Sequence, residues 1–301
     1  MSRPANGPGL PAHVVSLSRA AYGLSIALAV AATAAAAPTV FGDHVLRGPA
    51  VMNGSARGTA LVMLAIGVPG LVTAMRATRR GSSRAVLVWL GSASYLLYNA
   101  VLLLFATPFN RLFLLYVATF ALGLWAIGAA LTSLDVVGFG RLFTPGLPTR
   151  SIAVYTWVVV ALNATAWLKT IVPALLTDGP PSFLDGTGLT TFPLYVEDLA
   201  VWLPVMGLAA YWLWRRMAWG YLTVGSVLVM WAIEGLGVAV DQAFGHAADP
   251  TSGVASAAAV PMFAVFALVT AVPVALILRH LPRTPAARQR HSAHPASPHI
   301  V

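Results

Sequence analysis

Ionisable side chains inside long apolar stretches are the residues of this chain whose types could do chemistry. Such groups are costly in a bilayer and are therefore functional candidates by default. Lys169 is the only lysine in the chain and lies about seven residues from the outer end of its stretch, roughly 10 Å deep at 1.5 Å per residue. The candidates are Lys169, Glu197, Asp198, Glu234, Asp241 and the amide Asn99.

The depths of these groups predict one shared polar layer. Counted from the ends of the apolar stretches, all of them fall in the outer half of the membrane. One interpretation is a polar vestibule, open to the outside, that binds a small solute or a proton. The other is a structural ion pair between Lys169 and Glu234 or Asp198, because a buried charge needs a partner. A paired-carboxylate enzyme site using Glu197, Asp198 and Glu234 is a third interpretation. It is disfavoured because adjacent helical residues point about 100° apart, which makes Glu197 and Asp198 a poor acid/base dyad.

Several classes of chemistry are excluded or disfavoured by residues that the sequence lacks. The chain has no cysteine, which excludes disulfides, iron–sulfur clusters and thiolate metal sites. No histidine falls inside a predicted span, and we find no glycine-rich phosphate loop or Gly-x-Ser-x-Gly motif. We therefore expect no cofactor and no metal, and the sequence favours a protein that is not an enzyme.

Composition predicts the elements that must position these residues. Of 301 residues, 58% are hydrophobic and only 9% are charged, with a mean hydropathy of +0.79. Soluble domains have about 25% charged residues, so the lipid bilayer is the expected solvent. A span needs about 20 apolar residues. The sequence predicts an all-α, polytopic bundle with eight spans at 20–40, 58–76, 84–107, 110–133, 151–176, 194–214, 217–241 and 256–279.

The positions of the basic residues predict the orientation of the bundle. With the N-terminus inside, fourteen arginines fall on the cytoplasmic side and only Arg47, Arg57 and Arg111 fall on the other side. Such an excess in short loops is typical of cytoplasmic segments, so both termini are expected in the cytoplasm and no nucleic-acid partner is expected. The first span also resembles a signal peptide ending near residues 34–37, but its apolar run is long, which favours an uncleaved anchor. The fourteen are Arg3, Arg19, Arg76, Arg79, Arg80, Arg84, Arg141, Arg150, Arg215, Arg216, Arg279, Arg283, Arg288 and Arg290.

A shift of 135 residues predicts an internal repeat of four spans. It places Pro38 on Pro173, Pro69 on Pro204, Asp43 on Asp178, Arg80 on Arg215 and Asn99 on Glu234. A unit with an even number of spans repeats in the same orientation, which implies a pseudo-two-fold axis along the membrane normal. The predicted organisation is a cytoplasmic segment 1–19, a first half 20–133, a linker 134–150, a second half 151–279 and a disordered basic tail 280–301.

Several short motifs resemble a family of multi-pass bacterial integral membrane proteins that has no assigned function. They are Arg79-Arg80-Gly81-Ser82, Val88-Trp89-Leu90-Gly91, Tyr95-Leu96-Leu97-Tyr98-Asn99, residues 110–116, Asp198-Leu199, Pro204 and Arg215-Arg216, although Ala100 replaces an expected aromatic residue. The resemblance implies a multi-pass protein of the bacterial inner membrane, and it indicates no particular activity, substrate or site residues. Two functions remain open: a permease or carrier for a small polar or charged solute, and a non-catalytic scaffold or accessory subunit whose protein partners are unknown.

Overall fold

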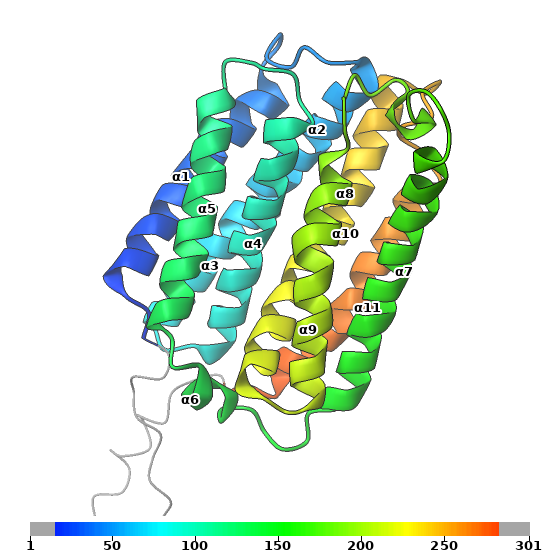
Figure 1. Ribbon diagram of the computed structural model, residues 1–301. Helices are drawn as coiled ribbons and strands as arrows, with labels where there is room; N and C mark the ends of the chain where they lie inside the picture. The colour runs from blue at the N-terminus through cyan, green and yellow to red at the C-terminus, as the bar shows by residue number, and fades with distance from the viewer. Residues whose placement is uncertain (1–15, 283–301) are drawn as a thin grey trace, which may run out of the picture.

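A computed structural model describes residues 16–282, and within that range the chain is a bundle of helices without strands (Figure 1). Eight helical stretches are long and apolar enough to cross a membrane, which confirms the predicted number. Most of segment 1–19 and of the tail 280–301 lies outside the described residues. The stretches are Arg19–Phe41 (α1), Ala50–Arg79 (α2, η2 and α3), Ser83–Phe105 (α4), Phe113–Ser133 (α5), Thr149–Leu175 (α7), Pro193–Trp214 (α8, η4 and α9), Ala218–Ala248 (α10) and Ala259–Arg279 (α11).

Two helical stretches extend farther than hydropathy predicted. The second begins at Ala50 instead of residue 58, and α10 ends at Ala248 instead of residue 241, so that His246 lies in its last turn. Both extensions occur where α2 and α10 pack with their backbones in close approach. A Cβ atom added to Gly54 would lie 2.5 Å from the backbone oxygen of Phe244. Packing of small residues between helices therefore stabilises turns that are not apolar enough to be recognised in the sequence.

Two short π-helical segments interrupt the second and sixth spans at an offset of 135 residues. They are η2 (Met63–Gly67) and η4 (Asp198–Trp202), and each is followed two residues later by a proline, Pro69 or Pro204. A proline lacks the backbone N–H that the preceding turn would use, so the helix widens where the proline enters. Such π-bulges often occur at functional sites, and η4 begins at Asp198.

The tight hairpins that follow α3 (Val68–Arg79) and α9 (Leu203–Trp214) have matching geometry. In the first, Ser82 N–H donates to the Ala77 carbonyl at 3.0 Å, and in the second Met217 N–H donates to the Trp212 carbonyl at 2.8 Å. Each hairpin contains one residue with positive φ, at 86° for Gly81 and at 57° for Arg216. All three pairs of positions are 135 residues apart.

The third and seventh helical stretches, α4 and α10, form the centre of the bundle. Their most apolar windows are 78% and 61% buried, against 6% for α7 and 17% for α11. The two central helices cross closely at Gly91, where an added Cβ would lie 2.6 Å from the Ser226 backbone oxygen. Polar side chains on α4 and α10 are therefore held inside the protein, whereas those on α7 can face its surroundings.

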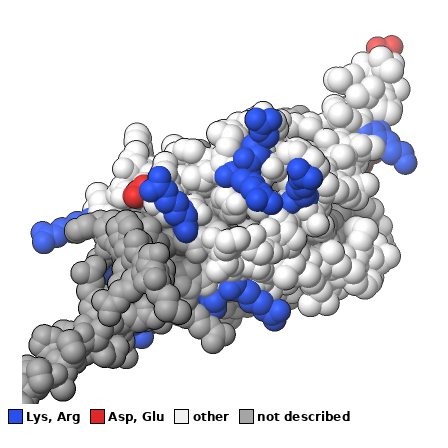
Figure 2. Space-filling model, turned by 90° about the horizontal axis from the view of Figure 1, so that it is seen from below, with Lys and Arg blue, Asp and Glu red and all other residues white. Residues whose placement is uncertain are grey.

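Arginines gather at one end of the bundle. Helix α1 begins and α11 ends there, next to the short helix α6 (Val136–Gly140) (Figure 1). Figure 2 views this end and shows several Lys and Arg side chains on it. The described residues at this end include Arg76, Arg79, Arg80, Arg84, Arg141, Arg150, Arg215, Arg216 and Arg279.

Candidate functional site

The two central helices are joined by a hydrogen bond between Asn99 and Glu234. Asn99 Nδ2 on α4 donates to Glu234 Oε2 on α10 at 2.8 Å, and also to the Tyr95 carbonyl at 3.0 Å. The two side chains are 2% and 9% exposed, so this contact lies in the interior. The sequence placed these two residues at equivalent positions of the predicted repeat, and the structure brings them into direct contact.

Asp198 accepts hydrogen bonds from two other helices. Tyr98 on α4 donates its hydroxyl to Oδ1 at 3.2 Å, and Trp167 on α7 donates Nε1 to Oδ2 at 2.8 Å. The carboxylate is only 2% exposed. As the first residue of η4, it connects α4, α7 and the π-helical part of the sixth span.

Glu197 precedes Asp198 and has one oxygen without a partner. Trp202 Nε1 donates to Oε2 at 3.2 Å, while Oε1 is buried and accepts no hydrogen bond. Buried polar atoms are nearly always paired, so an orphaned carboxylate oxygen indicates a place where a ligand or water can bind. Glu197, Asp198 and Glu234 are close enough for their charges to interact, and we call these three residues the acidic cluster.

Tyr95 places an unpaired hydroxyl beside the acidic cluster. Its ring packs at Gly67, the last residue of η2, where an added Cβ would lie 2.8 Å from the ring. Its hydroxyl oxygen is buried and has no hydrogen-bond partner. A Cβ added to Gly237 would lie 3.3 Å from this hydroxyl and 3.8 Å from Glu234 Oε2, so both groups border the same small space.

Asp241 lies on α10 but has a different neighbour from Glu234. Thr59 on α2 donates to its Oδ2 at 3.4 Å, and the adjacent Gln242 donates to its Oδ1 at 3.1 Å. Asp241 is seven residues beyond Glu234, a spacing that places both on one face of a helix. In the structure the neighbours differ because α10 packs against α4 at Glu234 and against α2 at Asp241, so Asp241 forms a separate contact nearer the C-terminal end of α10.

The predicted ion pair of Lys169 is wrong. Lys169 is exposed on α7 and forms no ion pair with any residue between 16 and 282. Helix α7 packs mainly on α9 and leaves most of its surface uncovered, so the lysine can extend its ammonium group along the helix towards the interface instead of burying it. None of the three carboxylates of the acidic cluster has a cationic partner among the described residues.

The donors to the carboxylates were not identified from the sequence. Tyr98, Trp167 and Trp202 supply three of the hydrogen bonds, but tryptophans and tyrosines in a membrane protein are usually interface or packing residues. Their ring contacts continue outwards, with Tyr98 and Trp202 centroids 5.9 Å apart and Trp167 and Tyr195 centroids 4.8 Å apart. The sequence contained one signal for these donors: Tyr98 directly precedes Asn99, which was already a candidate residue.

Comparisons with known proteins give no family for this chain. No protein-family model matches it, and no curated protein or solved structure matches it significantly. Among the described residues, no group of three His, Cys, Asp or Glu side chains could hold a metal ion. The geometry of the acidic cluster therefore carries the functional argument: three buried carboxyl groups, aromatic walls and a carboxyl oxygen without a hydrogen-bond partner.

Proposed function

We propose that this multi-pass membrane protein is a permease or carrier with an outward-facing polar site at the acidic cluster. The observation that carries the proposal is the burial of Glu197, Asp198 and Glu234 without any cationic partner among the described residues. Burying a carboxylate is unfavourable unless it is paired and hydrogen-bonded. A protein that keeps three of them together gains most when a positive solute enters.

The chemistry of the site favours a small organic cation as the solute. Carboxylates attract positive charge, and the faces of aromatic rings such as Trp167, Trp202 and Tyr98 stabilise ammonium groups by cation–π contact. The unpartnered Glu197 Oε1 and the Tyr95 hydroxyl can accept hydrogen bonds from such a solute. A metal ion fits less well, because a hard cation needs more oxygen ligands than the cluster brings together.

We place the arginine-rich end of the bundle in the cytoplasm of a bacterial cell, with the protein in the inner membrane. Cytoplasmic loops carry an excess of Lys and Arg, and α1 begins and α11 ends at this end (Figures 1 and 2). The acidic cluster then lies in the outer half of the membrane. There Asp198 is five residues from the outer end of its span at Pro193.

The proposal includes two parallel four-helix repeats, 20–133 and 151–279. The two π-helical segments, the two hairpins and the prolines Pro38 and Pro173 inside α1 and α7 all follow the 135-residue offset. Equivalent positions also touch each other, at Gly91 with Ser226 and at Asn99 with Glu234. Contacts between equivalent residues are expected where two parallel helices cross at a two-fold axis. Such an axis places the candidate site at the interface of the repeats.

Binding and uptake of quaternary ammonium probes test this function. Choline and tetramethylammonium should raise the melting temperature of the purified protein, because a ligand that binds only the folded state stabilises it. The neutral isostere 3,3-dimethylbutan-1-ol should have no effect. Proteoliposomes containing the protein should take up labelled choline, and Asp198→Asn and Glu234→Gln should abolish uptake. Equal responses to choline and to the neutral alcohol would contradict an anionic site.

One observation favours a second function, a membrane scaffold or accessory subunit. Both oxygens of Asp198 and one oxygen of Glu234 already accept hydrogen bonds from other helices, as a purely structural role requires. The structural ion pair that this alternative included is not formed. In a scaffold, Asp198→Asn should lower stability without changing any response to a cation.

A further inference from the structure

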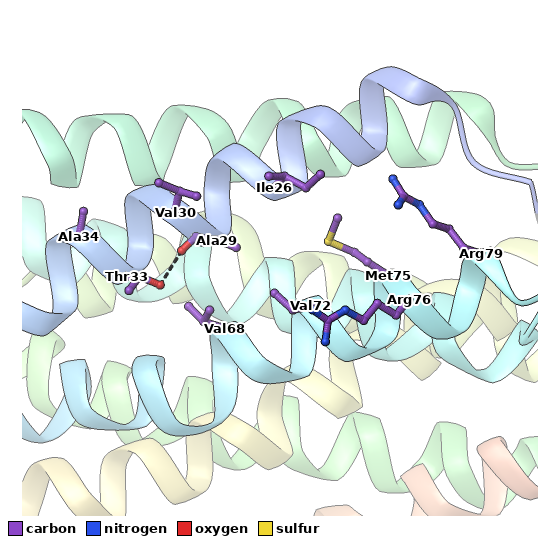
Figure 3. Close-up of a pocket in the computed structure, with 10 residues that line it drawn as sticks. All are labelled: Ile26, Ala29, Val30, Thr33, Ala34, Val68, Val72, Met75, Arg76 and Arg79. Carbon is purple, nitrogen blue, oxygen red and sulfur yellow. Dashed lines mark hydrogen bonds between the residues drawn. The ribbon is translucent and has the colours of Figure 1, made fainter.

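A groove between α1 and α3 has an apolar floor and a basic end. It encloses about 610 Å³, within the range of pockets that hold small ligands. Its apolar walls come from both helices, and Arg76 and Arg79 close it at the arginine-rich end of the bundle (Figure 3). The other lining residues are Ile26, Ala29, Val30, Thr33, Ala34, Val68, Val72 and Met75.

The dimensions of the groove match one membrane leaflet. From Ile26 to Ala34 the groove follows α1 for eight residues, about 12 Å at 1.5 Å per residue. Half of the hydrocarbon core of a bilayer is about 15 Å thick. The two arginines therefore lie near the headgroup level of the cytoplasmic leaflet in our orientation, and the apolar part reaches towards the middle of the membrane.

The groove has no polar group that would compete with a hydrocarbon chain. Its one hydroxyl group, on Thr33, donates its hydrogen bond to the Ala29 carbonyl of its own helix at 2.7 Å, so this hydrogen is already bonded. Val30 is 64% exposed and Ile26 is 49% exposed, so side chains of α1 are available to an occupant. Figure 3 shows Arg76 and Arg79 extending from α3 at the opposite end from Ala34.

At the positions 135 residues later, aromatic residues replace the two arginines, and the Arg150 guanidinium lies over one of them, 5.3 Å from the centre of the Trp214 ring. Tyr211 and Trp214 stand where Arg76 and Arg79 stand. In the first half the Arg79 guanidinium lies 4.4 Å from the centre of the Tyr22 ring, whereas in the second half Trp214 contacts Trp157, with ring centres 5.6 Å apart. The same structural position is thus basic in one half and aromatic in the other.

We propose that this groove binds an anionic phospholipid of the cytoplasmic leaflet. The lipid phosphate interacts with Arg76 and Arg79, and one acyl chain lies along α1 and α3. Arginine binds phosphate oxygens in a bidentate manner, and basic pockets between spans on the cytoplasmic side bind anionic headgroups. A zwitterionic lipid has the same chains but no net negative charge, so it gains less from the two arginines.

Native mass spectrometry of the purified protein with dioleoylphosphatidylglycerol and dioleoylphosphatidylcholine tests the proposal. We expect one phosphatidylglycerol to bind more tightly than phosphatidylcholine. Each basic residue contributes roughly fivefold to binding an anionic lipid, so Arg76→Gln with Arg79→Gln should weaken binding about 25-fold. The matched control, Arg215→Gln with Arg216→Gln, removes the same charge from the same end outside the groove and should change binding less than twofold.

A second variant separates the groove from general surface charge. Val30→Trp fills the groove while both arginines remain, and the exposed position of Val30 makes the substitution compatible with folding. It should weaken phosphatidylglycerol binding by tenfold or more with an unchanged melting temperature. The proposal would be overturned if the two lipids bound equally, or if the groove pair and the control pair of substitutions weakened binding equally. It would also be overturned if Val30→Trp left phosphatidylglycerol binding unchanged, or if inorganic phosphate alone displaced the lipid.

Discussion

Replacing Asn99 by leucine should remove the only hydrogen bond that Glu234 accepts within the described residues. Leucine and asparagine have the same number and branching of side-chain heavy atoms, so the substitution leaves no cavity and its main effect is electrostatic. Hydrogen bonds to charged groups contribute about 1.5–3 kcal/mol, and leaving one partner buried costs the full desolvation of that group. We expect Asn99→Leu to lower the free energy of unfolding by about 2–3 kcal/mol.

The matching change in Glu234 should cost less, and the double variant should recover. In Glu234→Leu the amide of Asn99 still donates to the Tyr95 carbonyl, so we expect a loss near 1 kcal/mol. With both residues replaced by leucine, no polar group is stranded, and replacing both partners by apolar residues can be nearly neutral. The coupling energy of the cycle should therefore be about 1.5–3 kcal/mol.

Thermal unfolding in detergent, followed by the fluorescence of the nine tryptophans, measures this cycle. A loss of 2–3 kcal/mol corresponds to roughly 4–10 °C in melting temperature. We expect a clear decrease for Asn99→Leu and a melting temperature near that of the wild type for the double variant. Additive losses in the double variant would refute the reasoning, because they would show that the two side chains do not depend on each other.

Three further predictions follow from other parts of the structure. Lys169→Met should change the free energy of unfolding by less than about 0.5 kcal/mol, because the lysine is exposed and unpaired among the described residues. A loss of several kcal/mol would instead support a buried ion pair of Lys169. Gly58→Ala should destabilise by about 1–3 kcal/mol, since its Cβ would lie 2.8 Å from the Asp241 Cα, whereas Gly23→Ala, with nothing within 4 Å, should be neutral or stabilising. Reporter fusions after Arg80, Arg150 and Arg216 should all read as cytoplasmic, and one external junction would contradict the orientation.

The sequence predicted the spans well because length and hydropathy decide them. Eight apolar stretches were enough to give eight helices, with ends that differ by a few residues except at Ala50 and Ala248. Those two ends depend on contacts between α2 and α10, which no local pattern reports. For the two π-helical segments, the sequence showed only the prolines Pro69 and Pro204. That the helix widens into π-helical turns just before each proline is visible only in the structure.

Of the residues predicted for the candidate site, the structure brings Asn99, Glu197, Asp198 and Glu234 together, and it leaves Lys169 outside this group. The predicted repeat placed Asn99 and Glu234 at equivalent positions, and depth along the spans placed Asp198 in the same layer as both. Their contact came from the structure. The error concerned Lys169, because depth along a helix does not say which way a side chain points. Helix α7 has apolar residues on all faces, so its periodicity could not show that the lysine faces away from α4 and α10.

Cysteine accessibility tests the central claim, a water-accessible anionic site in the outer half of the membrane. The chain has no cysteine, so Asn99→Cys at the acidic cluster can be introduced alone. Thr177→Cys, in the exposed outer loop, normalises reagent reactivity, and Ser25→Cys, buried beside Trp89, is the dry control. We expect externally added cationic methanethiosulfonate to modify Asn99→Cys at least about tenfold faster than the anionic reagent after normalisation, because a negative cleft concentrates cations. Asp198→Asn should reduce this preference. A cysteine at position 99 that reacts no faster than the one at Ser25, or that reacts equally with both reagents, would contradict the account.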